Sequence, residues 1–433
     1  MGIAILVVMA VGVALMLTRR LPTAFALALM GVAIALVVGA PITGDEGSVL
    51  VTVLQEGPVL LAATMIAILL GSWLGALLGD TGIASTLIRK TVEFAGDKPY
   101  VVAFGVFIVA ILCGAVTGSA PAAMLAGIVG IPTMIAVGVH ARAAAGTVLM
   151  GLGAGIPLEL TGWQYLSDAL RIPVEVVRDF QIRLFPIVVG VGLVYVFVQS
   201  RRRGLVHSWA MKVSGAQEPP GEDLRSRGRR VGDVAWYALP TPLVPLVLAL
   251  GLEVPIIPAL LAGVLYALLT TTRFSQIPRR ALRTLYRCFD VAAPPIVLFL
   301  AIGILLAAVR LPGAVEALDP ILGAVSPTLP ILFVVVFAVL APLALYRGPA
   351  NIYGLGAGIG GVLAVGGVYP IPAVLGLMAS YGQVLGVSDP TSTQVVWAAQ
   401  YAGVRPERVM LDTLPYTWII AAGGIGLAAV LYL

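Results

Sequence analysis

The chain has 433 residues, of which 60% are hydrophobic and only 11% charged, with a formal net charge of +5. A mean hydropathy of +1.04 and apolar runs of roughly the 20 residues needed to span a bilayer indicate an all-α polytopic membrane protein. The continuous apolar runs exclude a membrane β-barrel, whose strands alternate apolar and polar residues.

Apolar segments occur in two series along the chain. The first series covers 2–18, 22–39, 53–78, 99–138, 143–159 and 184–200, and the second covers 233–250, 254–271, 288–309, 328–367, 373–388 and 413–432. An offset near 230 residues superimposes the two series, and pairs Glu159 with Asp389 and Thr161 with Thr391. An ordered set of such matches indicates an internal duplication.

We therefore predict two repeats, residues 1–200 and 233–433, joined by a basic cytoplasmic linker at 201–232. Each repeat has about five transmembrane helices, one re-entrant hairpin and one broken helix. An odd number of crossings inverts the second repeat relative to the first. With this topology 21 of the 26 Lys and Arg residues lie on one face. The positive-inside rule then places both termini outside the cytoplasm, in a multi-pass protein of the cell inner membrane.

The regions 99–138 and 328–367 are too long for a single span, and each is interrupted by Gly, Pro and small polar residues, in "TGSAPA" and "YRGPAN". Backbone groups freed by a break inside a bilayer must be satisfied by protein or by a water-filled cavity. We predict that both interruptions are tips of re-entrant hairpins near the bilayer midplane. The charge distribution allows equally that each region crosses the membrane twice.

A second pair of breaks, "GAGIPLELTG" (153–162) and "VLGVSDPTST" (384–393), carries an acid followed two residues later by Thr. Paired breaks in transporters mark substrate and ion sites, because half-helix ends hold charged ligands. Carboxylates there can carry a proton or bind a hard cation such as Na+. As an alternative, each acid lies at the membrane edge as an ordinary solvated or helix-capping residue. The predicted coupling-ion site comprises Glu159, Thr161, Asp389, Thr391, Ser392, Gly118 and Ser388.

Arg347 is the only charged residue between Pro320 and Ser388. A guanidinium inside the bilayer needs a partner, and its planar fork can hold a substrate carboxylate with two hydrogen bonds. Alternatively, Arg347 pairs with Glu159 or Asp389, or caps backbone carbonyls. The predicted substrate site comprises Arg347, Gly348, Asn351, Ser119 and Thr117.

Several stretches carry a family resemblance, among them "LLAATMIAILLGSWLGALLGDTGIASTLI", "AILCGAVTGSAPAAMLAGIVGIPTM" and "GVSDPTST" followed by "LDTLPYTWIIAAGG". They resemble the large membrane subunit of TRAP transporters and, more broadly, the ion transporter superfamily of citrate- and dicarboxylate-type carriers. The resemblance implies a scaffold, a mobile elevator-like transport domain, sodium coupling and organic-anion cargo. It also implies a small membrane subunit and an extracytoplasmic binding protein as partners. The tip "TGSAPA" and the breaks "PLE" and "SDPT" depart from the family pattern, which leaves a proton-coupled stand-alone carrier open.

We therefore expect a secondary active transporter for a small organic anion, coupled to Na+ or H+, in contact with membrane lipid. The alternatives are a TRAP-type subunit that needs its partners, and a channel. His140 and His207 are too far apart in sequence for a recognisable ligand set, and Cys113 and Cys288 lie in apolar runs, so we expect neither an enzyme nor a cofactor beyond bound Na+. The positive charge follows the membrane topology, so we expect no nucleic-acid partner; a homo-oligomer remains open.

Overall fold

The computed structural model describes residues 1–18, 20–95, 98–202 and 234–433. Within these ranges every regular element is a helix, and eight helices are long and apolar enough to cross a membrane. The prediction of an all-α polytopic membrane protein is confirmed. Nearly all of the predicted basic linker, from residue 203 onward, lies outside the described residues.

The first half of the chain contains the following helices: α1 (Gly2–Leu17), α2 (Thr23–Val37), η1 (Val49–Glu56), α3 (Gly57–Val59), α4 (Ala62–Thr81), α5 (Ile83–Ala95), α6 (Pro99–Val116), α7 (Ala120–Ala136), α8 (Ala141–Gly155), η2 (Ile156–Leu158), α9 (Leu160–Leu170) and α10 (Val174–Arg202). Of these, η1 is a π-helix and η2 a 3-10 turn. The sequence analysis assigned no segment to α5 or α9.

The second half contains the following helices: η4 (Trp236–Ala238), η5 (Thr241–Leu243), α11 (Val244–Gly251), α12 (Ile256–Thr271), η6 (Phe274–Gln276), α13 (Ile277–Val309), α14 (Pro312–Val325), α15 (Pro330–Leu340), η7 (Ala341–Arg347), α16 (Leu355–Val365), α17 (Ile371–Ser388), α18 (Thr393–Tyr401) and α19 (Pro406–Tyr432). The sequence analysis assigned no segment to α14 or α18. Helices α9 and α18 are the second halves of the two broken helices.

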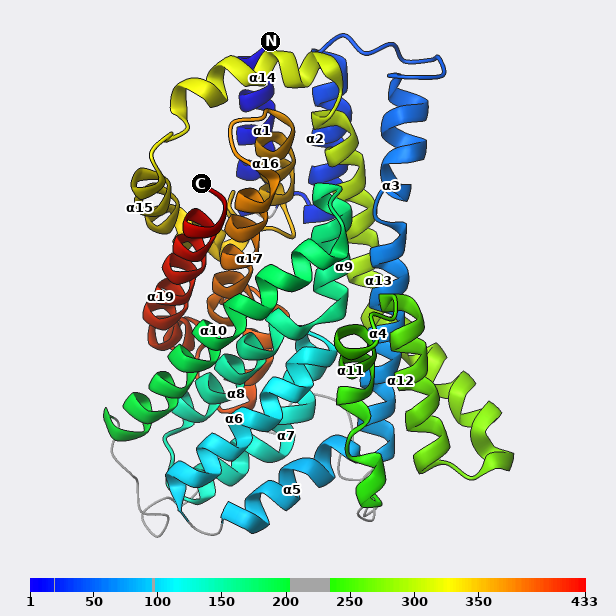
Figure 1. Ribbon diagram of the computed structural model, residues 1–433, viewed down its shortest axis with the longest axis vertical. Helices are drawn as coiled ribbons and strands as arrows, with labels where there is room; N and C mark the ends of the chain where they lie inside the picture. Colours follow the sequence, from blue (N-terminus) through cyan, green and yellow to red (C-terminus); the bar gives the residue numbers. More distant parts are fainter. Residues whose placement is uncertain (19, 96–97, 203–233) are drawn as a thin grey trace.

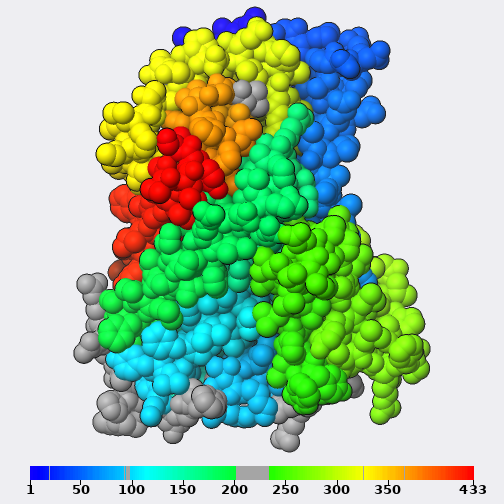
Figure 2. Space-filling view, viewed as in Figure 1, coloured from blue at the N-terminus to red at the C-terminus, as the bar shows by residue number. Residues whose placement is uncertain are grey.

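The helices form two groups that pack against each other (Figure 1). In the first group, here called the α13 bundle, α13 contacts α2 and α4, α4 contacts α12, α1 contacts α2, and α11 contacts α12. The second group, the hairpin bundle, contains α6–α10 and α15–α19. The groups meet where α9 contacts α4 and where α16 contacts α13. Figure 2 shows the space-filled surface over this boundary, with α11 and α12 against the first-half helices of the hairpin bundle.

Both predicted interruptions break the helical path. α6 ends at Val116, Thr117 and Ser119 are extended, and α7 begins at Ala120 with Pro121 in its first turn. Proline fits there because a helix start leaves its N–H groups without partners in any case. α6 and α7 pack against each other, as the arms of a hairpin do. In the second region the arms do not pack as a hairpin, because α15 packs on α19 while α16 packs on α13 and α17. The hairpin expected there stays a prediction, and the break between α15 and α16 is called the second hairpin tip only as a label.

Glycine allows close helix packing inside the hairpin bundle. A Cβ atom on Gly155 would lie 2.4 Å from the carbonyl oxygen of Ile111, and a Cβ atom on Gly114 would lie 2.5 Å from that of Leu152. Helices α6 and α8 therefore approach backbone to backbone, as small residues permit in membrane proteins. This approach brings the first hairpin tip next to the break that follows α8.

The outer faces of both bundles carry exposed apolar side chains. Examples are Leu29 of α2, Leu265 and Leu269 of α12, Val335 of α15 and Val430 of α19. Such faces suit lipid tails, which are as apolar as the side chains themselves. The polar side chains discussed next lie instead at the boundary between the bundles.

Candidate functional site

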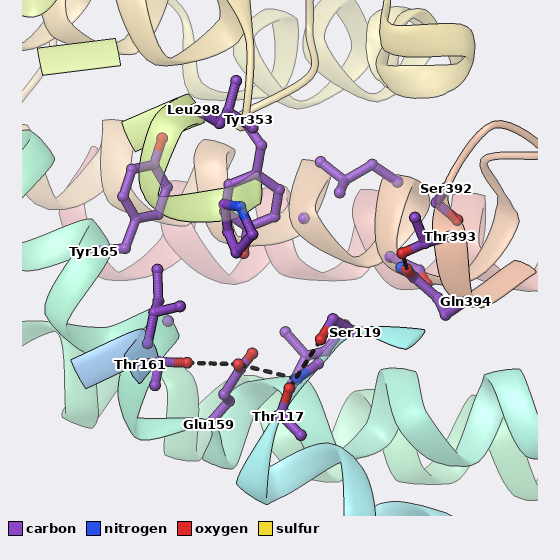
Figure 3. Close-up of a pocket in the computed structure, with 18 of the residues that line it drawn as sticks. Thr117, Ser119, Glu159, Thr161, Tyr165, Leu298, Tyr353, Ser392, Thr393 and Gln394 are labelled. Carbon is purple, nitrogen blue, oxygen red and sulfur yellow. Dashed lines mark hydrogen bonds between the residues drawn. The ribbon is translucent and has the colours of Figure 1, made fainter. Parts of the chain in front are cut away.

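A cavity of about 280 Å³ lies where the two hairpin tips, the two helix breaks and α13 come together (Figure 3). It brings together most of the predicted site residues. Those in its lining are Thr117, Gly118, Ser119, Glu159, Thr161, Arg347, Asn351, Asp389, Thr391 and Ser392. These residues come from both halves of the chain, so the cavity depends on the tertiary fold.

Glu159 occupies the first helix break. It is extended (φ −77°, ψ 110°) between the 3-10 turn η2 and the start of α9, and the side chain is only 9% exposed. Its Oε1 accepts hydrogen bonds from the backbone N–H of Gly118 (2.9 Å) and from the hydroxyl of Thr161 (2.5 Å) (Figure 3). The carboxylate thus connects the broken helix to the first hairpin tip.

Asp389 occupies the second break in the same way. It is extended (φ −70°, ψ 112°) after α17 and 2% exposed. Its Oδ1 accepts hydrogen bonds from the backbone N–H of Tyr346 (3.0 Å), and from the N–H (2.9 Å) and hydroxyl (2.8 Å) of Thr391. Each half of the chain therefore has a hairpin-tip N–H and a threonine hydroxyl, two residues further on, that donate to one buried carboxylate.

The two acids are buried, which argues against the alternative of solvated residues at the membrane edge. Neither acid caps a helix with its side chain, because α9 and α18 have no side-chain cap hydrogen bond, and the bond from the Thr391 N–H to Asp389 is an Asx turn that precedes α18. Among the described residues, neither Oε2 of Glu159 nor Oδ2 of Asp389 takes part in a hydrogen bond. These oxygens are available to a proton or a cation.

Arg347 lies at the second hairpin tip, on a left-handed turn. Tyr346 (φ 54°) and Arg347 (φ 58°) are consecutive residues with positive φ, a conformation that costs a non-glycine residue about 1–2 kcal/mol. The turn aims the Tyr346 N–H at Asp389 and exposes the Arg347 guanidinium to the cavity. Nη1 donates to the Thr23 hydroxyl of α2 at 2.8 Å.

The alternative roles predicted for Arg347 are absent from this arrangement. Among the described residues, neither Glu159 nor Asp389 forms an ion pair with Arg347, and no backbone carbonyl accepts from it. Thr23 is its one hydrogen-bond partner there. The remaining guanidinium donors are available to a bound anion.

Asn351 supports the tip more than it faces a ligand. Its Nδ2 donates to the carbonyl of Ala344 (3.4 Å) and its Oδ1 accepts from the N–H of Tyr353 (2.9 Å). A side-chain amide that satisfies backbone groups in a break replaces the missing helical hydrogen bonds. Asn351 is thus a positioning residue for Arg347, which lies four residues earlier in the chain.

Two predicted residues do not line the cavity. The Ser388 hydroxyl is hydrogen-bonded to Thr413 (2.9 Å) and Thr417 (2.8 Å), which ties α17 to α19. Gly348 lies under the tip, where a Cβ atom would approach the Leu343 carbonyl oxygen to 2.2 Å. Gly348 permits the fold of the tip and offers the cavity no side chain.

Several lining residues escaped the sequence analysis. They are Thr23, Ser72, Tyr165, Phe299, Tyr353, Thr393 and Gln394. Tyr165, Phe299 and Tyr353 form an aromatic cluster at one side of the cavity, with ring centroids 4.9–5.9 Å apart, and the Tyr165 hydroxyl donates to the carbonyl of Ile352. No local pattern in the sequence marks these residues, because three separate elements supply them.

The donor atoms around the two carboxylates suit a hard cation. Within the described part of the chain, no three His, Cys, Asp or Glu side chains gather as metal ligands. Sodium takes carboxylate, hydroxyl and carbonyl oxygens, and both carboxylates have a threonine hydroxyl beside them. The donor set around Glu159 and Asp389 therefore fits Na+ or a proton.

Comparisons with known proteins identify the fold. No family model matches the sequence, and no curated protein sequence matches it. A crystal structure of the YdaH transporter of Alcanivorax borkumensis, described as having an unusual topology, is similar with a TM-score of 0.61 and 17% identity, over 94% of this chain and 98% of that one. This structural similarity gives no support to the resemblance to TRAP transporters, which stays a prediction. The chain has the fold of a polytopic membrane transporter.

Proposed function

We propose that this protein is a secondary active transporter that moves a small organic anion of the carboxylate or dicarboxylate class, coupled to Na+ or H+. The observation that carries the proposal is the charge content of the cavity. Of the described residues that line it, only Arg347, Glu159 and Asp389 are charged. They supply one cationic group for the cargo and two carboxylates for the coupling ion.

The charge balance explains the coupling. When both carboxylates are ionised, the three groups carry a net charge of −1, and an anionic cargo is repelled. A proton or Na+ on either acid removes this repulsion, which is strong in a cavity shielded from bulk water. Cation and anion then bind with positive coupling, and each raises the affinity for the other by the same factor.

The hairpin tips connect this binding to movement. Glu159 and Asp389 each hold a tip backbone through one oxygen, so a cation bound at these acids stabilises the closed tips. The hairpin bundle also binds the α13 bundle through side chains that can exchange partners. Arg347 donates to Thr23, and Asp168 of α9 accepts from the N–H (3.1 Å) and hydroxyl (2.6 Å) of Thr64 on α4.

We propose an elevator-like alternating-access mechanism, in which the hairpin bundle moves along the α13 bundle with its bound ligands. Movement of one rigid group past another needs a boundary whose contacts can be released. We further propose the inner membrane as the location, with both termini outside the cytoplasm. Helix α5 and the basic start of α13 lie toward the lower end of Figure 1, opposite the N-terminus, which fits this orientation.

The test is counterflow in proteoliposomes that contain only the purified chain. Vesicles loaded with an unlabelled dicarboxylate are expected to accumulate the labelled compound in a saturable manner, and a Na+ or proton gradient is expected to drive net uptake. No counterflow with any carboxylate, together with steady ion conduction, would identify a channel instead. Uptake that appears only after a small membrane subunit and an extracytoplasmic binding protein are added would identify a TRAP-type complex.

A further inference from the structure

A second cavity, of about 210 Å³, lies between the bundles and apart from the central site. Its lining shares no residue with that of the central cavity. The residues that line it are Leu170, Arg171, Arg310, Ala364 and Ile371. They come from the ends of α9 and α13, from α16 and from the first residue of α17, so the cavity is a junction of both bundles.

Arg310 enters this cavity with most of its guanidinium unsatisfied. Its Nη2 donates to the carbonyl of Ala169, near the end of α9. Nε and Nη1 are buried and have no hydrogen-bond partner among the described residues. Buried charged donors without partners are costly, so this geometry favours an acceptor that the described part of the chain does not provide.

A second guanidinium adds to the positive charge. Arg171 ends α9 in a left-handed conformation (φ 53°). Burial, and then the nearby charge of Arg171, lower the pKa of Arg310 to about 10. Within the described ranges neither arginine forms an ion pair with a carboxylate. Arg171 is exposed, so solvent screens part of its repulsion with Arg310, and an anion bound between the two guanidinium groups would relieve the rest.

The amino end of α17 adds to the positive charge around this cavity. This helix of 18 residues begins at Ile371, in the wall of the cavity, and no side chain caps its first N–H groups. The amino end of a helix carries a partial positive charge and favours anions. It adds to the charge of the two arginines, and the unpaired donors of Arg310 are the primary evidence.

We propose that this cavity is an anion site, distinct from the central one, that binds a small oxyanion, either free phosphate or the phosphate of a lipid headgroup. One of the two unpartnered Arg310 donors, Nε or Nη1, donates to an oxygen of the anion, and Arg171 neutralises part of the remaining charge. Because α9, α16 and α17 belong to the hairpin bundle and α13 to the other, a bound oxyanion stabilises the described arrangement of the bundles relative to one displaced from it.

The experiment is a thermal-shift titration of the purified full chain in phospholipid-free detergent. Inorganic phosphate is compared with chloride at equal ionic strength. We expect a saturable rise in melting temperature with phosphate. Arg310→Gln, Arg310→Lys and Arg171→Gln should each weaken the apparent affinity by about tenfold or more, the effect of losing a charge-assisted hydrogen bond. Arg408→Gln removes an exposed charge elsewhere and should leave the affinity unchanged.

Three results decide the proposal. The proposal would be overturned if all three variants kept the stabilisation by phosphate. It would also be overturned if wild type were stabilised neither by free phosphate nor by nanodiscs that contain an anionic phospholipid. Stabilisation only by nanodiscs with phosphatidylglycerol over phosphatidylcholine, lost in the variants, identifies the headgroup as ligand. Arg347→Gln should keep the phosphate effect while losing carboxylate binding, so this site and the proposed transport function can fail independently.

Discussion

The guanidinium of Arg347 donates a hydrogen bond to the hydroxyl of Thr23, 2.8 Å away and 324 residues earlier in the chain. The bond crosses the boundary between the bundles, from the second hairpin tip to α2. It occupies one of the guanidinium donors and leaves the others available. Under the proposed function, a cargo carboxylate that also takes this donor would compete with a contact that holds the bundles together and would help to release the hairpin bundle.

The first prediction separates the two roles of Arg347. Arg347→Gln should abolish carboxylate binding and uptake, because a neutral amide replaces the one cationic group of the cavity. Arg347→Lys keeps the charge but loses the bidentate geometry, and should weaken binding by about tenfold. Titration calorimetry of each purified variant with dicarboxylates gives the affinities.

Thr23→Val is the matched control for this pair. It removes the hydroxyl partner of Arg347 and leaves the guanidinium in place. Carboxylate affinity should stay the same or rise, since a competing bond of about 1 kcal/mol is gone. A loss of affinity as large as that of Arg347→Gln would show that Thr23, and not the charge, determines binding.

A second prediction concerns the buried acids. Glu159→Gln and Asp389→Asn remove a negative charge and keep a carbonyl oxygen that can accept from the hairpin tip. Each variant should bind carboxylate with a weaker dependence on Na+ or protons than wild type, because less repulsion remains to be neutralised. Each should lose uptake driven by the cation gradient. Affinity measured across Na+ concentration and pH is the readout, and an unchanged cation dependence in both would contradict the account.

The third prediction uses the corresponding threonines. Thr161→Val and Thr391→Val each delete a hydroxyl bonded to a carboxylate, at 2.5 and 2.8 Å. A hydrogen bond of about 1 kcal/mol corresponds to a roughly fivefold change in affinity for the coupling cation. The serine variants, which retain the hydroxyl, should behave as wild type. If one valine variant is neutral, only the other carboxylate belongs to the cation site.

A fourth prediction concerns the packing that places the first tip. Gly155→Ala should destabilise the protein by about 1–3 kcal/mol, the range for overpacking. The new Cβ would meet backbone atoms of Ile111 and Ala115 at 2.4 and 2.6 Å. Gly190→Ala on α10 meets no atom within 4 Å and should leave the melting temperature unchanged or slightly raised. Thermal unfolding in detergent compares the two variants.

The sequence predicts the helix breaks because their signal is local. Gly, Pro and small polar residues interrupt segments that would otherwise be unbroken helices in the bilayer. In each half of the chain, the break after the hairpin region is marked by an acid with a threonine two residues later. Glu159, Asp389 and Arg347 could be identified from this pattern together with the rarity of charge in the bilayer. The tertiary fold brings these residues together in one cavity. The sequence alone does not show which donors bond to which acceptors.

Other features have no local signal. Thr23 reaches Arg347 from the opposite end of the chain, and the aromatic cluster of Tyr165, Phe299 and Tyr353 combines three separate elements. Gly348 and Ser388 were assigned to the site because they are close to it in sequence, but their contacts point elsewhere. α9 and α18 were overlooked because half-helices of 11 and 9 residues are too short to register as spans.

If the proposed function holds, one guanidinium and two carboxylates make anion binding depend on a cation. The affinity of the purified chain for a dicarboxylate, titrated with and without Na+ at neutral pH and again at acidic pH, tests this dependence. We expect binding that strengthens with Na+ or with acid in wild type and is absent in Arg347→Gln under every condition. Binding that is indifferent to both cations, or that survives in Arg347→Gln, would contradict it.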